Sequence, residues 1–243
     1  MTSNITGALG KVCATTATTF LLFAATAQAA TMSFGPSPYL QTGGLDTPVG
    51  FFDFGPGSQI AWIEDFETNG TIDPFLTISP GGVLAPNSSS GLGAPITDSV
   101  DADDGTIDGN GNDGYSYFAD GVRSVTIEYM TGVRAAGVVF TDGDSRSTNI
   151  RLEAFDTMGN LLGTIDAGDL ADDVFTGQTA EDRFLGFTDD MTPIGSITLS
   201  MDAGIGIEID HVHWQTPTVP EPSSQCLALF ALIGLVQLRR VRR

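Results

Sequence analysis

The sequence predicts an all-β protein built around a single antiparallel β-sandwich of jelly-roll type, and three observations lead to this class. From about residue 51 to residue 214, short apolar runs alternate with polar residues at the period of two that is typical of strands. Clusters of Gly, Asp and Asn separate these runs, as turns separate strands. No stretch of twelve residues keeps a helical period. About eight strands in about 165 residues favour a sandwich or jelly roll, with a small β-barrel as the alternative.

The individual strands are predicted from this alternation. They cover residues 60–67, 125–129, 133–140, 150–154, 161–165, 197–201 and 205–209. The run 133–140 is apolar enough to be a central strand, whereas Ile150, Leu152 and Ala154 alternate with polar neighbours and predict a strand with one buried face.

The connections are predicted from residues that favour turns. Residues 156–160 form a turn between two strands, and the Gly-, Pro- and Ser-rich stretches 31–50 and 79–97 are expected to be loops. Residues 168–175 have room for one short helical turn. The length fits one domain, which we expect to span residues 30–215.

The net charge of −20 is the sum of three unlike segments. Residues 1–29 carry one Lys and no acid, and residues 220–243 carry four Arg and one Glu. Residues 30–219 carry 29 acids, 23 of them Asp, against five Arg and no Lys, which gives −24. So acidic a domain repels phosphate backbones, which excludes nucleic-acid binding through a basic patch.

The amino-terminal segment has the features of a secretory signal peptide. Lys11 precedes an apolar, Thr-rich run over residues 12–25, and Ala27, Gln28 and Ala29 form the small-x-small pattern of a signal peptidase site. We expect residues 1–29 to be removed after Ala29. The chain's two cysteines lie in the terminal segments, so the exported domain contains no disulfide.

The carboxyl-terminal segment, residues 216–243, has three parts. A Pro-rich spacer covers residues 216–224, an apolar run covers residues 226–238, and an Arg cluster covers residues 239–243. Thirteen residues of helix reach about 20 Å, which is short of a full membrane span. We expect a short hydrophobic helix that anchors the chain to the membrane at least transiently. The arginines would keep the chain end on the cytoplasmic side.

Together these three parts resemble the PEP-CTERM sorting signal of exported bacterial proteins. The resemblance implies that an exosortase-type membrane enzyme processes the tail and passes the protein to the cell envelope or extracellular matrix. The residues that carry it are Val219, Pro220, Glu221, Pro222, Arg239, Arg240, Arg242 and Arg243.

An Asp-, Gly- and Asn-rich tract between residues 98 and 120 predicts a calcium site. Hard Ca²⁺ takes six to eight oxygen ligands, which short Asp and Asn side chains on a bending backbone can supply. The expected ligands are Asp101, Asp103, Asp108, Asn110 and Asp113. An EF-hand register fails because Asp113 stands where that loop requires Gly. The alternative is a solvated acidic loop.

Residues 133–214 resemble a domain that recurs in PEP-CTERM proteins and is similar to the galactose-binding-like jelly rolls of carbohydrate-binding modules. The resemblance implies a fold and, more weakly, binding of an exopolysaccharide. It also implies a second, structural Ca²⁺ between acids of an early strand and the last one. The residues in those places are Glu64, Asp65 or Glu67, and Asp210.

The remaining candidates have competing interpretations. His211 and His213 share one side of a strand and could bind a transition metal together with a carboxylate, or be one packed and one surface residue. They lie an even number of positions away from Ile207 and Ile209, so a bulge or a strand end must turn them outward if those isoleucines are core. Trp62 and Trp214 are core residues or a sugar-stacking platform.

The loop before residue 184 is expected to be ordered, with Arg183 fastening a carboxylate or a backbone carbonyl. Hydrolase, metalloprotease and phosphate-binding motifs are absent from the sequence, which favours a non-catalytic protein. The alternative is a polysaccharide-acting hydrolase of the cell surface.

Overall fold

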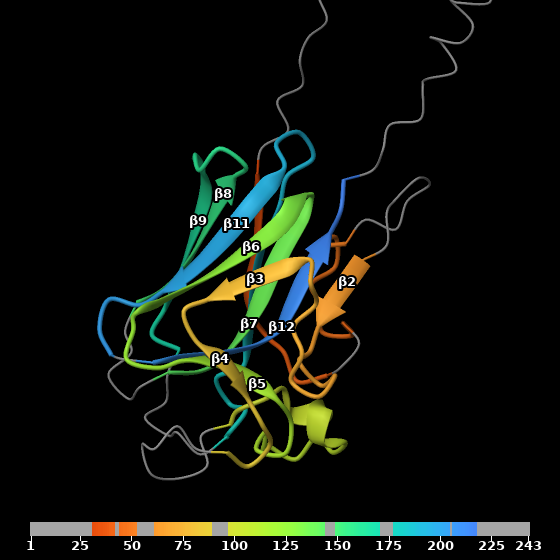
Figure 1. Ribbon diagram of the computed structural model, residues 1–243, viewed down its shortest axis with the longest axis vertical. Helices are drawn as coiled ribbons and strands as arrows, with labels where there is room; N and C mark the ends of the chain where they lie inside the picture. The colour runs from red at the N-terminus through yellow and green to blue at the C-terminus, as the bar shows by residue number, and fades with distance from the viewer. Residues whose placement is uncertain are drawn as a thin grey trace, which may run out of the picture.

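The structure is a computed structural model, and it describes residues 31–41, 44–52, 61–88, 97–143, 149–170, 177–204 and 206–217. These residues form two antiparallel sheets packed face to face (Figure 1), which confirms the all-β prediction. The predicted signal peptide and the sorting residues 219–243 lie outside the described ranges. Within those ranges, no helix has the length and apolar character needed to cross a membrane.

The larger sheet has the strand order β1, β10, β7, β12, β5, β4, and β2 also pairs with β12. In that order its strands are Met32–Pro38, Arg183–Thr188, Ala135–Gly143, Ile207–Gln215, Ser116–Ala119 and Gly82–Leu84, with β2 at Ala61–Glu64. The smaller sheet has the order β3, β6, β11, β8, β9. Its strands are Leu76–Ser79, Ser124–Val133, Ile194–Ser200, Ile150–Asp156 and Leu161–Gly168.

The main core lies between the two sheets. Ile127 and Leu152 contribute from the smaller sheet, and Val138 and Ile207 contribute from the larger one. Strand β8 alternates buried and half-buried residues, as its sequence predicts. Strands β7 and β12 are instead buried at every residue, because chain segments also cover the outer face of the larger sheet.

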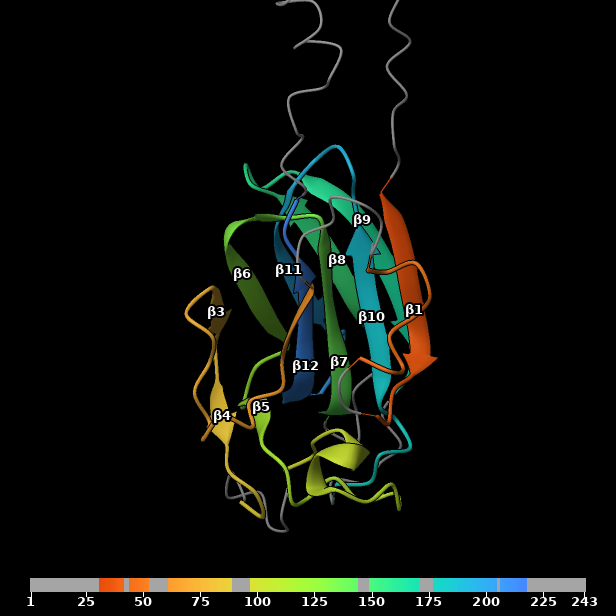
Figure 2. The same ribbon diagram turned by 90° about the vertical axis from the view of Figure 1, so that its right-hand side faces the viewer.

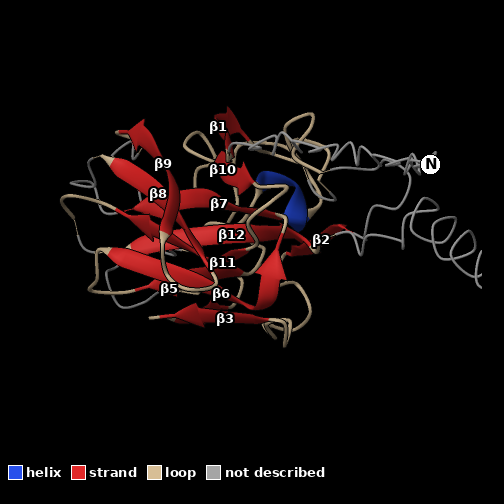
Figure 3. Cartoon of the chain, turned by 90° about the horizontal axis from the view of Figure 1, so that it is seen from above, coloured by secondary structure: helices blue, strands red, loops and turns tan. Residues whose placement is uncertain are grey.

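This covering layer consists of residues 39–41, 44–52 and 97–104, and it forms a second apolar cluster with the sheet. Tyr39, Phe51 and Val100 pack there against Val139 and Phe184. Figure 2 shows the short 3₁₀ helix η1 (Asp101–Asp104) near the lower ends of β7 and β12, and Figure 3 shows the same helix in blue. Polar side chains on the outer face of β12 are therefore buried beneath a second layer.

Several predicted boundaries are wrong. Twelve strands appear in the described ranges where the pattern predicts about eight. The predicted loop 31–50 contains β1, and the predicted loop 79–97 contains β4. Both are edge strands, where Gly and Pro are tolerated because one side of the strand has no partner. Strand β9 extends to Gly168, where a helical turn was expected to begin, and residues 171–176 lie outside the description.

Candidate metal centre

A β-bulge in β12 determines which side chains reach the outer face of the larger sheet. Ile207 and Ile209 lie in the main core, and so do Val212 and Trp214, so the alternation shifts by one residue between the pairs. The shift occurs at His211, which has a φ of 41°, and the register with β7 changes in the same place. The predicted bulge is therefore present.

His213 is a buried, neutral residue of the second apolar cluster. Its Nε2 lies 3.1 Å from the hydroxyl of Tyr39, and its ring packs against Phe184. Burial is the main cause that lowers the pKa of His213 well below its ordinary value. His211 is also buried, with 1% of its surface exposed, so the alternative of one packed and one surface histidine is wrong.

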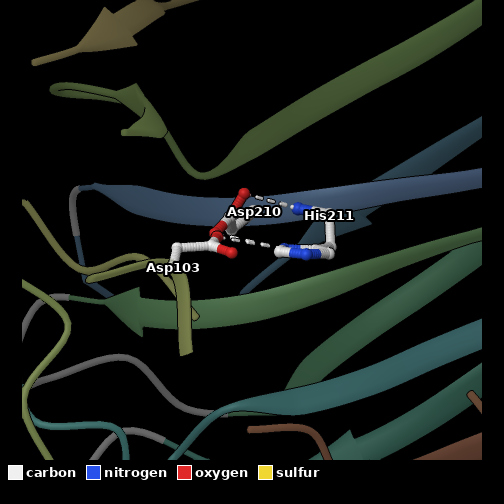
Figure 4. Close-up of side chains that lie close together, drawn as sticks. All are labelled: Asp103, Asp210 and His211. Atoms are coloured by element: carbon white, nitrogen blue, oxygen red, sulfur yellow. Dashed lines mark hydrogen bonds and ion pairs between the residues drawn. The ribbon is translucent and has the colours of Figure 1, made fainter. Parts of the chain in front are cut away.

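His211 lies beside two carboxylates (Figure 4). Its Nδ1 is 3.3 Å from Oδ2 of Asp210 and 3.6 Å from Oδ2 of Asp103. All three side chains are at most 2% exposed. Among the described residues, this is the one group of three His, Cys, Asp or Glu side chains whose ligand atoms lie within 4.8 Å of one another. The structure thus places a closed, mixed nitrogen and oxygen donor set at the bulge.

Further carboxylates are buried close to this group. Asp98 and Asp182 are fully buried, and within the described ranges neither oxygen of either carboxylate has a hydrogen-bond partner. Oε1 of Glu208 accepts hydrogen bonds from the Asp98 amide at 2.8 Å and from the Ser116 hydroxyl. We refer to Asp98, Asp103, Asp182, Glu208 and Asp210 as the buried acid cluster.

The acids of this cluster interact electrostatically. Burial, followed by the charges of Asp182 and Glu208, raises the pKa of Asp98 well above its ordinary value; Asp142 and Glu181 add to this. Burial and Asp210 raise the pKa of Asp182 in the same way.

Asp103, beside His211, follows the same pattern. Burial and the adjacent Asp210 raise the pKa of Asp103 to about 11. As metal-free groups, Asp98, Asp103 and Asp182 therefore favour the protonated state.

Basic side chains compensate the cluster poorly. Arg183 is next in sequence to Asp182, and its charge lowers the pKa of that carboxyl, but burial and the neighbouring acids outweigh it. Its Nη1 donates to the backbone carbonyls of Ala180 and Asp182. The prediction that Arg183 fastens a backbone carbonyl is confirmed. Because Arg183 donates to these carbonyls, it forms no salt bridge with the described carboxylates of the cluster.

The five ligands predicted in the acidic tract do not converge on one point. Asp101 accepts hydrogen bonds from the amides of Asp108 and Gly109 and from the Thr179 hydroxyl, so it closes its own loop. Asp108 and Asp113 are exposed, and Asp113 bonds to the amide side chain of Asn87. Oδ1 of Asn110 accepts from the amide of Asn112. Only Asp103 of this set joins the three-residue group, because backbone amides satisfy Asp101 and Asn110 while Asp108 and Asp113 lie at the surface.

The second predicted set is also divided. The two carboxylate oxygens of Glu64 accept hydrogen bonds from the backbone amides of Phe66 and Asp73, so this residue has a structural role. Oε1 of Glu67 accepts a hydrogen bond from the Tyr115 amide at 2.5 Å. Burial raises the pKa of Glu67, the charge of Asp210 raises it further and that of His211 lowers it, so Glu67 lies at the edge of the site. Asp210 alone lies at its centre.

The structure therefore joins one residue from each predicted site, Asp103 and Asp210, and adds residues that the sequence analysis did not select. Asp98 belongs to the acidic tract, and Glu208 shares the polar face of β12 with Asp210, so the sequence could have indicated both as candidate ligands. For Asp182, the sequence offers no such indication beyond its position before Arg183. Their convergence depends on how distant segments pack over the sheet.

The two tryptophans stack on each other. Their ring centroids are 6.4 Å apart with an interplanar angle of 14°, and Phe75 also stacks on Trp214. Trp214 is 2% exposed, which confirms the core prediction, whereas Trp62 on β2 is 46% exposed and lies at the surface. The core prediction for Trp62 is wrong because β2 is a short strand off the main sheet path.

No protein-family model matches this chain, and a search of curated proteins finds no relative. The chemistry of the site must therefore be inferred from its own residues.

Proposed function

We propose that this chain is an exported, non-catalytic protein of the cell envelope or extracellular matrix whose β-sandwich is stabilised by Ca²⁺ in the buried acid cluster. The observation that supports this most directly is the pair Asp98 and Asp182, whose four carboxylate oxygens are buried without hydrogen-bond donors in the described ranges. An ionised carboxylate in such a place costs several kcal/mol unless a cation or proton compensates it. At neutral pH a divalent cation compensates two carboxylates at once.

The donor set around Asp98 fits calcium. Ca²⁺ binds oxygen ligands at about 2.3–2.6 Å and prefers carboxylates and amide carbonyls. Oδ1 of Asn112 is a further buried oxygen without a partner. A Cβ atom on Gly111 would lie 2.8 Å from Oδ1 of Asp98, and one on Gly177 would lie 1.9 Å from Oδ1 of Asn112. Glycine at both positions therefore leaves room for these oxygens.

Calcium in this place would hold distant parts of the chain together. The cluster combines Asp98 from the covering layer, Asp182 from the segment before β10, and Glu208 from β12. The loop over residues 97–115 is already held by backbone bonds from Ser99 to Gly111 and from Gly111 to Gly177. A cation would add the cross-link that a disulfide supplies in other exported domains. Extracellular modules bind Ca²⁺ with Kd values of about 10⁻⁴–10⁻³ M.

A calcium titration of the chelator-stripped full chain by isothermal calorimetry tests the proposal. We expect a saturable binding heat with a Kd in about that range. Asp182→Asn should weaken binding at least about tenfold, since it removes one charged ligand. Asp166→Asn is the matched control, because that carboxylate is 74% exposed and pairs with Arg151. Absence of binding heat, or equal affinity in the two variants, would overturn the proposal.

Export and sorting form the second part of the proposal, and the terminal sequences support them. Signal peptidase would release the chain after Ala29, and an exosortase-type enzyme would act on the tail around Val219 to Pro222. The tail would hold the protein at the membrane until then. A reporter fused after Arg243 should stay cytoplasmic while the sandwich is exported. A secreted reporter would contradict this topology.

Polysaccharide is the ligand that the exposed aromatic surface best supports. Trp62 presents part of its ring to solvent, and its stacking on Trp214 holds it in one orientation. A hollow of about 560 Å³ is lined by Phe52, Ala61 and Ile63 among others; Ala61 and Ile63 alternate with Trp62 along β2, so this hollow lies on the opposite face of the strand from the Trp62 ring. On a glycan array, we expect binding that Trp62→Ala abolishes and Met158→Ala, at another exposed apolar residue, leaves unchanged. No binding by the unaltered protein would indicate a purely structural matrix role.

A further inference from the structure

The group of Asp103, Asp210 and His211 has a different chemistry from the rest of the buried acid cluster, because it includes an imidazole. Nδ1 of His211 and Oδ2 of Asp103 are buried and have no hydrogen-bond partner in the described ranges. The distances of 3.3 and 3.6 Å from Nδ1 to the two carboxylates exceed the usual 2.7–3.2 Å of an N–H···O hydrogen bond. The imidazole nitrogen thus faces both carboxylates without a hydrogen bond to either.

The separation of 3.3 Å from Nδ1 to Asp210 equals the spacing between ligands of a small tetrahedral ion, and the separation of 3.6 Å to Asp103 is slightly longer. An ion with bonds of about 2.0–2.1 Å holds neighbouring ligand atoms about 3.3–3.4 Å apart. Imidazole nitrogen and carboxylate oxygen are both ordinary ligands of Zn²⁺, whereas Ca²⁺ takes oxygen ligands at longer distances. The donor types and the distances therefore favour the same class of metal.

The surrounding structure holds the three side chains in place. Oδ2 of Asp210 accepts from the Val100 amide at 2.8 Å, and Oδ1 accepts from the His211 amide at 2.7 Å. Helix η1, which carries Asp103, is fixed by the bond from the Ala102 amide to the Leu40 carbonyl at 3.1 Å. The positive φ of His211 is uncommon for a residue other than Gly and sets the direction of its ring.

We propose that Asp103, Asp210 and His211 bind one divalent transition-type metal ion, with Zn²⁺ as the reference ion, in a structural site. Glu67, at the edge of the group, or a water molecule would complete four-fold coordination. The site is closed to solvent, which is typical of structural rather than catalytic zinc. This second ion is separate from the proposed calcium, which Asp98, Asp182 and Glu208 would hold. The charge of Asp210 acts on Asp182, so the two sites interact electrostatically.

The test is a zinc titration of the chelator-stripped full chain against a chromophoric competing chelator. We expect one Zn²⁺ per chain. His211→Gln should weaken binding at least about a hundredfold, because it removes the single nitrogen ligand. His213→Gln is the matched control, since that ring is equally buried but bonds to Tyr39. Equal zinc affinity in the two variants, or no tight binding by the unaltered chain, would overturn the proposal.

A measurement on the unaltered protein covers the case in which His211→Gln does not fold. X-ray absorption of the zinc-loaded chain should show four nitrogen and oxygen ligands with one imidazole, and a spectrum without imidazole would contradict the assignment. Calcium affinity measured in zinc-loaded protein separates the two proposals. A chain that binds calcium but not zinc would contradict only this site. A chain that binds zinc but not calcium would contradict only the calcium site.

Discussion

The carboxylates of two regions of this domain have opposite environments. At the turn between β8 and β9, Oδ1 of Asp156 accepts from the amides of Met158 and Asn160, and Oδ2 accepts from the Asn160 side chain, each at 2.8 Å. These bonds lower the pKa of Asp156. Asp98 and Asp182 in the buried acid cluster have no such donors, and burial raises the pKa of each. The turn stabilises its own charge, whereas the cluster requires a proton or a cation.

This difference shows that the charge of −24 is not one uniform property. Acids that bond to their own turn contribute to the fold at neutral pH without any ion. Acids packed beneath the covering layer oppose folding when they are ionised and no cation lies beside them. Calcium dependence should therefore follow a few buried residues and not the total charge.

The largest expected effect is on the pH dependence of stability in chelator. Asp98, Asp182 and Glu208 have raised pKa values when folded, so the folded chain binds more protons than the unfolded one. Their stabilisation is fully present below the unfolded pKa of about 4 and is lost as pH rises through the folded values. Thermal unfolding followed by circular dichroism should give a higher Tm at about pH 5 than at about pH 8. A metal-free protein that is most stable at about pH 8 would contradict the raised pKa values of these acids.

Asp98→Asn should give an intermediate effect whose sign depends on calcium. In chelator at about pH 8, the variant should be more stable than the unaltered chain by about 1–3 kcal/mol, because it removes a buried carboxyl that must either take up a proton on folding or remain as an uncompensated charge. In calcium it should be less stable than the unaltered chain, because a ligand is lost. Denaturant unfolding in both conditions measures this, with Asp166→Asn as the exposed control. A variant that is destabilised equally in both conditions would show that Asp98 has only a packing role.

Asp156→Ala should give the smallest effect, and calcium should not change it. The variant loses the hydrogen bonds that hold the turn, so it should be less stable at neutral pH. Because the pKa of Asp156 is lowered in the folded state, its contribution is present above the unfolded pKa and disappears as pH falls through the folded value. Tm differences between the variant and the unaltered chain should therefore shrink in acid. A calcium-dependent difference would remove the distinction between the two regions.

The sequence predicts those parts of the fold in which one face of a strand is buried. The alternation over β6, β8 and β11 is visible because each has a core face and a polar face. Strand β1 was not predicted, because Gly and Pro interrupt it and an edge strand tolerates them. Strand β10 is a short apolar run without alternation, since both its faces are covered.

The site was predicted only in pieces. Asp103 and Asp210 were both expected to bind a cation, but in different places, because their contact depends on how the covering layer packs over β12. The spacing of Ile207 and Ile209 from the histidines indicated a bulge or a strand end near His211. It did not indicate which carboxylates the bulge would bring together. Asp98 and Asp101 are three residues apart and similar in sequence context. Only the folded backbone decides that Asp101 finds amide donors and Asp98 does not.

Thermal unfolding of the full chain with and without calcium tests the central claim most directly. At a calcium concentration of about a hundred times Kd, binding to the folded state alone adds about 2.7 kcal/mol. For a domain of this size, that corresponds to a rise in Tm of about 5–11 °C over the chelator-treated protein. We expect this rise, and we expect Asp182→Asn to lose most of it. An unchanged Tm in chelator and in calcium would contradict the account.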